Sequence, residues 1–378
     1  MAWRVPLVDL NYGEGETRAV LDVLEGGWLT MGQVTKDFEQ QFAKFVGAKY
    51  ALATSNATVA LHLACLALGI GPGDEVIVPS LSFVATANAV LYTGAAVRFA
   101  DIVGLDELNV SPTEIEKQIT QRTKAIIVMH YGGYACQMPE ILDIAARFGL
   151  SVIEDAAHSP GAVLDGKALG TWGDVGCFSF FSNKNLATGE GGMLITNRED
   201  IAERVRSLRS HGMTSLTWDR HQGHAYTYDV VELGYNYRID EIRSALGMVQ
   251  LQKLAANNAR RKAITEGYTR ALEGSGLDLP FQNMLKERRL KPAYHIFPII
   301  LPQDVIRLSF MDSLREAGVQ SSIHYPPIHQ FSYYRQMHSS TVLPKTEEAA
   351  HREVTLPLYP SMSDAQVSLV IDTVQSAL

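Results

Sequence analysis

Residues 151–158 read SVIEDAAH, an apolar run that ends in a carboxylate and is followed closely by a histidine. The run Ser151–Glu154 predicts a short buried strand, because continuous Val and Ile residues are typical of strands covered on both faces. Asp155 then stands at the carboxyl end of this strand, which is the edge where parallel sheets bind ligands. Asp155 and His158 are therefore candidate functional residues, and the alternative for Asp155 is a helix cap.

Strand and helix patterns alternate on both sides of this segment. The expected strands are Tyr50–Thr54, Glu75–Pro79, Ala96–Ala100, Ala125–His130, Ser151–Glu154, Val175–Phe180 and Gly192–Thr196. Helical patterns fall between them, as at Val59–Leu68, Thr113–Gln118 and Pro139–Phe148. Alternation of this kind predicts an α/β domain with a mainly parallel, doubly wound sheet.

A second, smaller region is expected in the C-terminal part of the chain. A long helical stretch starts at Ile242 and leads to a strand at Tyr294–Leu301, a helix at Ser309–Ala317 and a second strand at Val319–His324. We therefore predict a large domain over residues 1–250, a small α+β domain over residues 251–378, and a cleft between them.

The composition argues against several classes of protein. With 46% hydrophobic residues, the 378-residue chain can bury one large core and a smaller one. The formal net charge is −8 and no run of Lys or Arg stands out, so a nucleic-acid-binding surface is not expected. Residues 76–97 carry no charge, but Pro79 and Gly94 favour a strand, a turn and a helix over a membrane span.

The cysteines and the N-terminus point to the cytoplasm. Cys65, Cys136 and Cys177 lie far apart and match no metal-binding or redox spacing, so no metal site is expected. Each has apolar neighbours, as small core residues do, and a disulfide framework is not expected. The N-terminus lacks the apolar stretch of a signal peptide.

The second candidate segment is residues 178–192, FSFFSNKNLATGEGG, which contains Lys184. Lys184 follows a predicted strand and precedes a turn in which Gly189 and Gly191 permit close backbone approaches. A partly desolvated lysine has a lowered pKa, as a Schiff-base nucleophile requires. The hydroxyl of nearby Ser179 suits a phosphate. Because a lone lysine is more often a solvated loop residue, the prediction depends on the residues that accompany it.

Two further segments follow predicted strands. Residues 54–58, TSNAT, precede a helix, and the free N–H groups and positive dipole of a helix N-terminus bind phosphate, although an ordinary cap is the alternative. Residues 79–86 include Phe83, whose ring either stacks on a planar cofactor or packs in the core. Together with Asp155 and Lys184, these segments suit pyridoxal phosphate (PLP), which needs a ring-nitrogen partner, a lysine, phosphate donors and a stacking ring.

With these segments in order, the chain resembles the DegT/DnrJ/StrS group of PLP-dependent sugar-nucleotide aminotransferases, which have the fold-type-I architecture. The similarity runs from VPL at residues 5–7 to LPLYP at residues 356–360, nearly the whole chain. Beside the two segments around Asp155 and Lys184, its landmarks are GWLTMG (27–32), ALHLA (60–64), GPGDEV (71–76), ELGYNYR (232–238) and HYPP (324–327). This ordered set is far more specific than any one of its motifs.

The resemblance implies a role for each residue of the cofactor site. Lys184 is implied to form the Schiff base with PLP and then to act as the general base and acid. Asp155 is implied to pair with the protonated ring nitrogen, and His158 to lie near the ring hydroxyl. Phe83 is implied to stack on the face of the ring.

The same resemblance covers the phosphate of the cofactor. Ser179, Ala57 and Thr58 are implied to bind it, although most members of the family have Gly where Ala57 stands. Asn236 matches a residue that reaches the phosphate bound by the neighbouring subunit. A homodimer with shared active sites is therefore implied.

The implied reaction transfers an amino group from glutamate to a keto-sugar nucleotide during the biosynthesis of an amino sugar. His158 is more typical of members that act at C4 than of those that act at C3. A C3 keto group and a keto-cyclitol are the alternative acceptors. Candidates to shape the acceptor site or bind its diphosphate are His324, Tyr325, His329, Arg206, Arg209 and Arg238. For the arginines, ordinary surface salt bridges are the favoured alternative.

Other functions fit the sequence less well. Some relatives are dehydratases that carry His in place of the Schiff-base lysine, and Lys184 argues against that activity. A regulatory protein that binds DNA directly would need a basic helix-turn-helix segment, which the sequence does not offer. A dinucleotide-binding oxidoreductase would need a G-x-G-x-x-G motif after a strand, and none is found.

Overall fold

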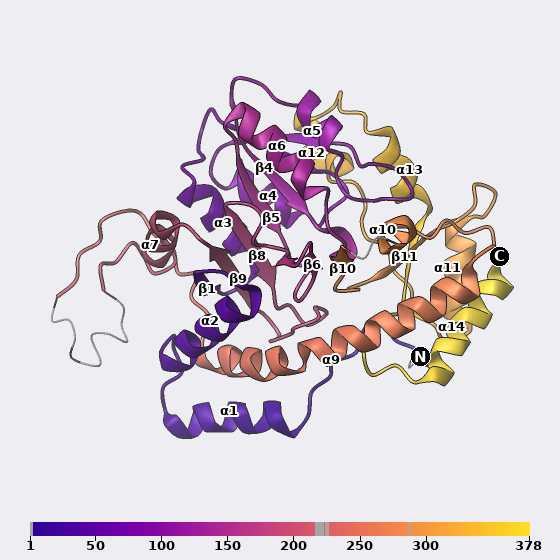
Figure 1. The fold of residues 1–378 in the computed structure, drawn as a ribbon, viewed down its shortest axis with the longest axis horizontal. Helices are drawn as coiled ribbons and strands as arrows, with labels where there is room; N and C mark the ends of the chain where they lie inside the picture. Colours follow the sequence, from indigo (N-terminus) through magenta and orange to yellow (C-terminus); the bar gives the residue numbers. More distant parts are fainter. Residues whose placement is uncertain (1–2, 216–222, 224–226, 287–288) are drawn as a thin grey trace.

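A seven-stranded sheet forms the centre of the large region of the molecule (Figure 1). The computed structural model describes residues 3–215, 223, 227–286 and 289–378. The strand order is β1-β9-β8-β5-β4-β2-β3. Neighbouring strands from β8 to β3 pair in parallel, whereas β9 runs antiparallel to β8 and to β1. The predicted α/β fold with a mainly parallel sheet is therefore confirmed.

The sheet strands are β1 (Tyr50–Thr54), β2 (Glu75–Pro79), β3 (Ala96–Ala100), β4 (Thr123–Met129), β5 (Ser151–Asp155), β8 (Val175–Ser179) and β9 (Gly192–Thr196). The short strands β6 (Val163–Leu164), β7 (Lys167–Ala168) and β10 (Leu290–Lys291) form a separate small sheet. All seven strands predicted for the large sheet are confirmed, and their ends differ from the prediction by two residues at most.

The helices around the large sheet are α1 (Glu14–Gly26), α2 (Gln33–Val46), α3 (Ala57–Ala67), α4 (Ala85–Leu91), α5 (Pro112–Lys117), α6 (Met138–Phe148), α7 (Glu199–Leu208) and α9 (Glu241–Leu272). The remaining helices are α10 (Gln282–Lys286), α11 (Arg307–Glu316), α12 (Ser332–Met337), α13 (Pro344–Arg352) and α14 (Asp364–Ala377). Two 3₁₀ turns, η1 (Tyr131–Gly133) and η2 (Ile328–Gln330), complete the described elements.

Alternate residues of the strands face two layers of helices. On one face, Leu52 of β1 and Leu194 of β9 pack in a core with residues of α3, α4 and α7. On the opposite face, Ala51 and Ile195 pack with residues of α2 and α9, while β4 and β5 contact α5 and α6. Because helices exclude water from both faces, the central strands are continuous apolar runs.

The C-terminal region contains a two-stranded antiparallel sheet of β11 (Phe297–Ile300) and β12 (Glu353–Leu356), packed with α11 and α14. The predicted strand Val319–His324 is wrong, because this segment makes only isolated bridges, from Val319 to Val5 and from Ser322 to Thr355. Its backbone contacts two separate segments in turn and cannot run along either one. β12, which the sequence did not indicate, takes its place as the second strand.

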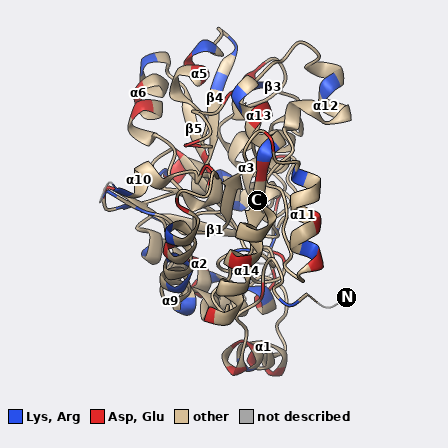
Figure 2. Ribbon diagram, turned by 90° about the vertical axis from the view of Figure 1, so that its right-hand side faces the viewer, with Lys and Arg blue, Asp and Glu red and all other residues tan. Residues whose placement is uncertain are grey.

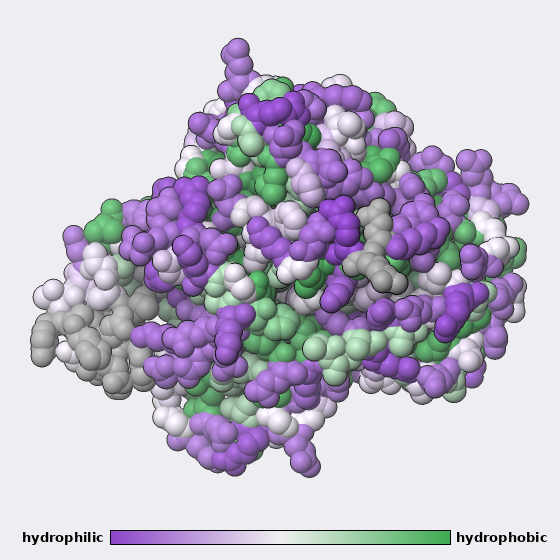
Figure 3. All heavy atoms as spheres, viewed as in Figure 1, coloured by the Kyte–Doolittle hydropathy of each residue, from purple (hydrophilic) through white to green (hydrophobic). Residues whose placement is uncertain are grey.

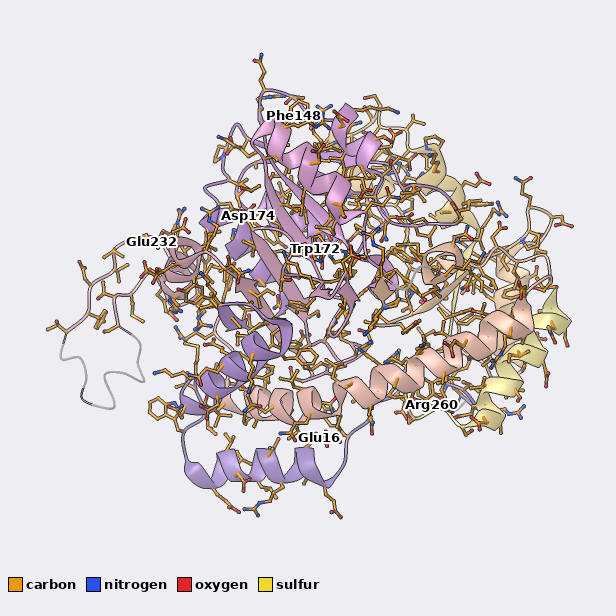
Figure 4. The ribbon with its side chains drawn as sticks, in the orientation of Figure 1. Glu16, Phe148, Trp172, Asp174, Glu232 and Arg260 are labelled. Carbon is orange, nitrogen blue, oxygen red and sulfur yellow. The ribbon has the colours of Figure 1, made fainter. Side chains whose placement is uncertain are left out.

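Helix α9 joins the two regions. It begins at Glu241, after Asp240 caps it by accepting a bond from the N–H of Arg243, and it contacts α1 and α2 at one end and α14 at the other (Figure 1). The expected boundary between residues 250 and 251 falls inside this helix. Between α1 and α9, the buried carboxylate of Glu16 accepts hydrogen bonds from Gln250 at 2.6 Å and Lys253 at 2.8 Å (Figure 4).

The surface is polar and mixed in charge. Acidic and basic residues lie mainly on the outer helices, such as α6 and α11, rather than on the sheet (Figure 2). Hydrophilic side chains cover most of the face drawn in Figure 3, and hydrophobic ones gather near its middle. The three cysteines are free and buried. Across the described residues, helices are too short or too polar to cross a membrane.

Candidate active site

A cavity of about 490 Å³ lies at the carboxyl ends of β5 and β8, beside the N-terminus of α3. Seven of the eight predicted site residues line it, as do two C-terminal residues, namely Ala57, Thr58, Phe83, Asp155, His158, Ser179, Lys184, His324 and Tyr325. The parallel strands explain this convergence, because their carboxyl ends meet at one edge of the sheet. Asn236 is the predicted residue that does not line the cavity, and its side chain is exposed.

Asp155 is the last residue of β5 and is buried. The hydroxyl of Thr86 donates to its Oδ2 at 2.7 Å, and the N–H of Ala157 donates to its Oδ1 at 3.2 Å. Because Thr86 uses its proton on Asp155, the hydroxyl of Ser82, 2.7 Å away, donates to Thr86 in turn. Burial raises the pKa of the Asp155 carboxyl, and the hydrogen bond from Thr86 partly offsets this effect.

Lys184 lies in the turn that follows β8, where its N–H donates to the carbonyl of Phe181 at 2.9 Å. The residue is half-buried, and its amine faces the cavity. Desolvation lowers the pKa of the amine to about 8, against the Coulomb attraction of Asp155, which raises the pKa. The lowered pKa predicted for Lys184 is thus found in the structure.

Three buried histidines, His158, His295 and His324, lie near enough to Lys184 for its charge to act on their pKa values. Burial lowers the pKa of each, to about 3 for His324, and Lys184 adds to the effect, so all three are neutral. The N–H of Gly132 donates to His158 Nδ1 at 3.2 Å, so His158 carries its proton on Nε2. That proton is donated to the hydroxyl of Tyr325, 2.9 Å away.

The N-terminus of α3 forms the other wall of the cavity. The side chain of Asn56 caps the helix by accepting a bond from the N–H of Val59 at 3.0 Å, which leaves Ala57 and Thr58 as the first helical residues. Helix N–H groups at this point are suited to a phosphate. Gly192 lies directly behind: a Cβ there would be 2.5 Å from the carbonyl carbon of Asn56. The start of β9 and the start of α3 therefore touch.

Two further features suit a bound cofactor. Phe83 is 57% exposed, with its ring centroid 6.1 Å from that of Tyr325, so an aromatic face stands open to the cavity. The side-chain oxygen of Asn183, in the described part of the chain, is buried in the wall without a hydrogen-bond donor. Aromatic surface left open and a buried acceptor left unsatisfied are both expected where a ligand completes the site.

The three arginines considered for a diphosphate lie outside this cavity. Arg209 is buried and forms an ion pair with Glu39 at 2.5 Å, and Arg206 lies over the ring of Tyr50 at 5.4 Å. Arg238 is half-buried in the segment that also carries Asn236. His329 is bonded to Ser80 at 2.7 Å and to Glu347 at 3.1 Å, away from the cavity wall. Structural roles therefore account for Arg206, Arg209 and His329 in this chain.

Sequence reasoning missed several residues of the site. Thr86 stood in the segment around Phe83, yet only the three-dimensional structure shows that it donates to Asp155. His295 lay inside a predicted apolar strand and carried no signal of its own. Asn183 and Asn185 flank Lys184, but the side-chain partners of Asn185 are far away in the sequence, and the unsatisfied oxygen of Asn183 is visible only in the folded chain. A periodic pattern does not report such long-range contacts.

Comparison with known proteins decides the family. The sequence profile of the DegT/DnrJ/EryC1/StrS aminotransferase family matches residues 11–375. The chain belongs to this family. Its members depend on PLP, so the chain is a PLP-dependent aminotransferase, and the fold-type-I architecture and the family resemblance expected from the sequence are confirmed.

Individual relatives of this aminotransferase agree. It is 39% identical to the spore coat polysaccharide biosynthesis protein SpsC of Bacillus subtilis, over 99% of this chain and 96% of SpsC. It is 34% identical to the aminotransferase TlmJ of Streptoalloteichus hindustanus, with a TM-score of 0.91 over 99% of this chain and 98% of TlmJ. PseC of Helicobacter pylori, an aminotransferase involved in the biosynthesis of pseudoaminic acid, is 29% identical, with a TM-score of 0.91 over 99% and 98% of the chains.

We expect the charge of Asp155 to control the reactivity of Lys184. The Asp155→Asn change removes the attraction that raises the pKa of the lysine, so the pKa should fall below 8 by about one unit. The measurement is the pH profile of amine labelling in cofactor-free protein, followed by mass spectrometry of the Lys184 peptide. Asp143→Asn, on the exposed surface of α6, is the matched control. An unchanged profile for Asp155→Asn would contradict the assignment.

Proposed function

We propose that this aminotransferase uses PLP held by Lys184 to move an amino group from glutamate to a keto-sugar nucleotide, at C4 of the sugar. One observation carries the proposal: the amine of Lys184, the carboxylate of Asp155 and the N-terminus of α3 face one cavity. Few cofactors need a lysine, a buried carboxylate and a phosphate site together, and PLP is the one that does so in aminotransferases.

The residues present fit the cofactor group by group. Ala57 and Thr58, with the hydroxyl of Ser179, would bind the phosphate, and the methyl group of Ala57 leaves its backbone N–H available. Asp155 would pair with the ring nitrogen, and Phe83 would stack on the ring. His158 would lie on the side of the ring hydroxyl, where Tyr325 holds it in place. When bound, PLP supplies an electron sink for a negative charge on the carbon beside the amino group.

The protein itself supplies the charge balance and the proton transfers. Thr86 and Ala157 hold Asp155 as a hydrogen-bond acceptor. The negative charge of Asp155 would therefore stabilise a positive charge on the ring nitrogen that it faces. The amine of Lys184, with a pKa of about 8, loses and regains a proton readily near neutral pH. The neutral histidines around it provide no competing charge, and so Lys184 is the group we assign as general base and acid.

The substrates are inferred from the family and from the cavity. Glutamate is the amino donor that the family resemblance implies, and it would leave as 2-oxoglutarate while the keto carbon of the acceptor becomes an amine. The roles printed for SpsC and PseC, in polysaccharide and pseudoaminic acid biosynthesis, support a sugar acceptor. His324 and Tyr325 line the cavity from the C-terminal side and would contact that sugar. His158 favours C4 over C3.

Lys184→Ala tests the cofactor assignment. The variant should fail to form the visible absorbance of lysine-bound PLP and should lose amino transfer by more than a thousandfold, because a general base and the covalent anchor are removed together. Absorbance spectra and single-turnover assays with glutamate provide the measurement. Lys117→Ala, an exposed lysine of α5, should behave as the parent protein. A Lys184→Ala enzyme that still transaminates would overturn the proposal.

The acceptor is tested with a panel of 4-keto and 3-keto sugar nucleotides and a keto-cyclitol, each assayed with glutamate. We expect amine formation at C4 of a sugar nucleotide, with release of one 2-oxoglutarate for each amine formed. NMR of the product identifies the aminated carbon. Amination of the 3-keto sugars or of the keto-cyclitol alone would show that the acceptor is wrong while leaving the role of Lys184 intact.

We further propose that the enzyme works as a homodimer in which Asn236 reaches the cofactor site of the partner subunit. Tyr235 and Tyr237 stack on each other and pack against His62 of α3, which leaves Asn236 between them exposed. The segment is fixed to the cavity wall, because the N–H of Ser55 donates to the carbonyl of Tyr237 at 2.9 Å. Asn236 is thus held in an exposed position and does not line its own cavity.

Mixed dimers test this arrangement. Asn236→Ala and Lys184→Ala should each be impaired alone, but a dimer of one chain of each kind has one complete site. After unfolding and refolding an equal mixture, activity should return to about a quarter of that of the unmodified protein, as random pairing of subunits requires. The control mixes Lys184→Ala with Asp155→Asn, whose defects lie in the same site of one chain, and should show no recovery. Equal behaviour of both mixtures would contradict the shared site.

A further inference from the structure

The amine of Lys184 has a neighbour that the proposed function does not use. His295 lies between β10 and β11, and its Nε2 is 3.5 Å from the Nζ of Lys184, within reach of a long hydrogen bond. The imidazole is buried and packs on the ring of His158, with the ring centroids 4.2 Å apart. Whether Nε2 of His295 accepts or donates toward the amine is decided by the other ring nitrogen.

Asn185, the residue after Lys184, has a fixed side-chain orientation. Its amide nitrogen donates to the carbonyl of Ala293 at 2.7 Å and to the side-chain oxygen of Asn258 at 2.8 Å. Asn258 itself is fixed, because its amide nitrogen donates to the carbonyl of Pro160 at 2.9 Å. Turning the amide of Asn185 over would set its oxygen against two other oxygens, so the side-chain oxygen must point the other way.

That oxygen lies 3.0 Å from Nδ1 of His295. An amide oxygen can only accept a hydrogen bond, so Nδ1 must carry the proton. A neutral imidazole carries a single proton, and burial holds His295 neutral by lowering its pKa well below the usual value. Nε2 therefore presents a lone pair to Lys184 and can only accept. A chain of obligatory donors and acceptors runs from Pro160 through Asn258 and Asn185 to the amine.

We propose that His295, locked in the Nδ1–H tautomer by Asn185, is a positioning residue that accepts a hydrogen bond from the amine of Lys184. The inference rests on the proposed role of Lys184 and adds to it. Whenever the amine is not bonded to the cofactor, His295 gives it a fixed place at the cavity wall. The amine is then within reach of the same reacting carbon each time it transfers a proton.

The groups that face this pair support the assignment. Asp155, from β5, is the acidic group that attracts the lysine, and His158 and His324 face it as neutral rings. Arg261 of α9 approaches His295 from behind, where it donates to the His295 carbonyl at 3.2 Å and opposes a positive charge on the ring. A second proton on His295 would thus meet Arg261 on one side and the lysine on the other.

Two substitutions separate the roles of the two ring nitrogens. In His295→Asn, the side-chain amide reaches the position of Nδ1, so the bond to Asn185 is kept while Lys184 loses its acceptor. In His295→Gln, the amide oxygen reaches the position of Nε2 and restores an acceptor for the amine. Because an accepted hydrogen bond favours the charged lysine, the first change should lower the pKa of Lys184 and the second should not.

The test is the pH profile of amine labelling at Lys184 in full-length, cofactor-free protein. For His295→Asn we expect the midpoint to fall by about one pH unit, the effect of losing a hydrogen bond to a charged group. For His295→Gln the midpoint should stay within about 0.3 unit of that of the unmodified protein. Equal shifts in both variants, or no shift in either, would overturn the proposal.

A second measurement needs no variant, because it uses the unmodified protein. Nitrogen NMR of the histidine rings in the unmodified, cofactor-free chain reports which ring nitrogen carries the proton, and His295 should be in the Nδ1–H form. An Nε2–H signal would refute the proposal. Neither measurement depends on turnover, so they stay informative if Lys184→Ala shows that another lysine binds the cofactor.

Discussion

The structure depends on keeping one lysine amine and one carboxylate out of water in the same cavity. Ionised groups are costly to bury unless other groups compensate them. The sheet makes the arrangement possible: β5 and β8 pair in parallel with Asp155 opposite Cys177, so the turn that carries Lys184 leaves β8 beside the end of β5. The two charges interact through space and share one wall of the cavity.

The histidines near the lysine are neutral, and the hydrogen bonds of His158 and His295 fix which ring nitrogen of each carries the proton. His158 gives its proton to Tyr325 and accepts from Gly132, while His295 gives its proton to Asn185. The amine is desolvated by these rings without meeting a second positive charge. A lysine with a pKa of about 8 follows from that environment, and an amine of this kind combines appreciable neutral population with rapid reprotonation.

Much of this could be predicted from the sequence, for physical reasons. Strands covered on both faces give continuous apolar runs, and the residues directly after them, such as Asp155, then mark the binding edge. Contacts between distant segments leave no such pattern. His295 looks like one polar residue in an apolar stretch, and Thr86 like a hydroxyl in a turn.

β12 was hidden for a related reason. Glu353 is fully buried in this strand, where it accepts bonds from the N–H of His324 and from Thr355, and burial raises its pKa to about 8. A glutamate at the end of a charged helical segment gives no hint of an inward-facing strand residue. Thr355 is a neighbour in the same strand, but His324 lies 29 residues away in the sequence and is brought to Glu353 only by folding.

The continuity of α9 limits how far the molecule is modular. This helix has 32 residues and is therefore about 48 Å long. Glu241 at its start accepts hydrogen bonds from backbone N–H groups at the start of α2, Asn258 holds Asn185 beside the cavity, and Tyr268 near its end donates to the carbonyl of Pro357. A C-terminal region exchanged as a cassette at residue 250 would replace most of α9 with a foreign sequence. Grafting a new acceptor specificity onto this scaffold is therefore better done by replacing loops at the cavity rim than by swapping domains.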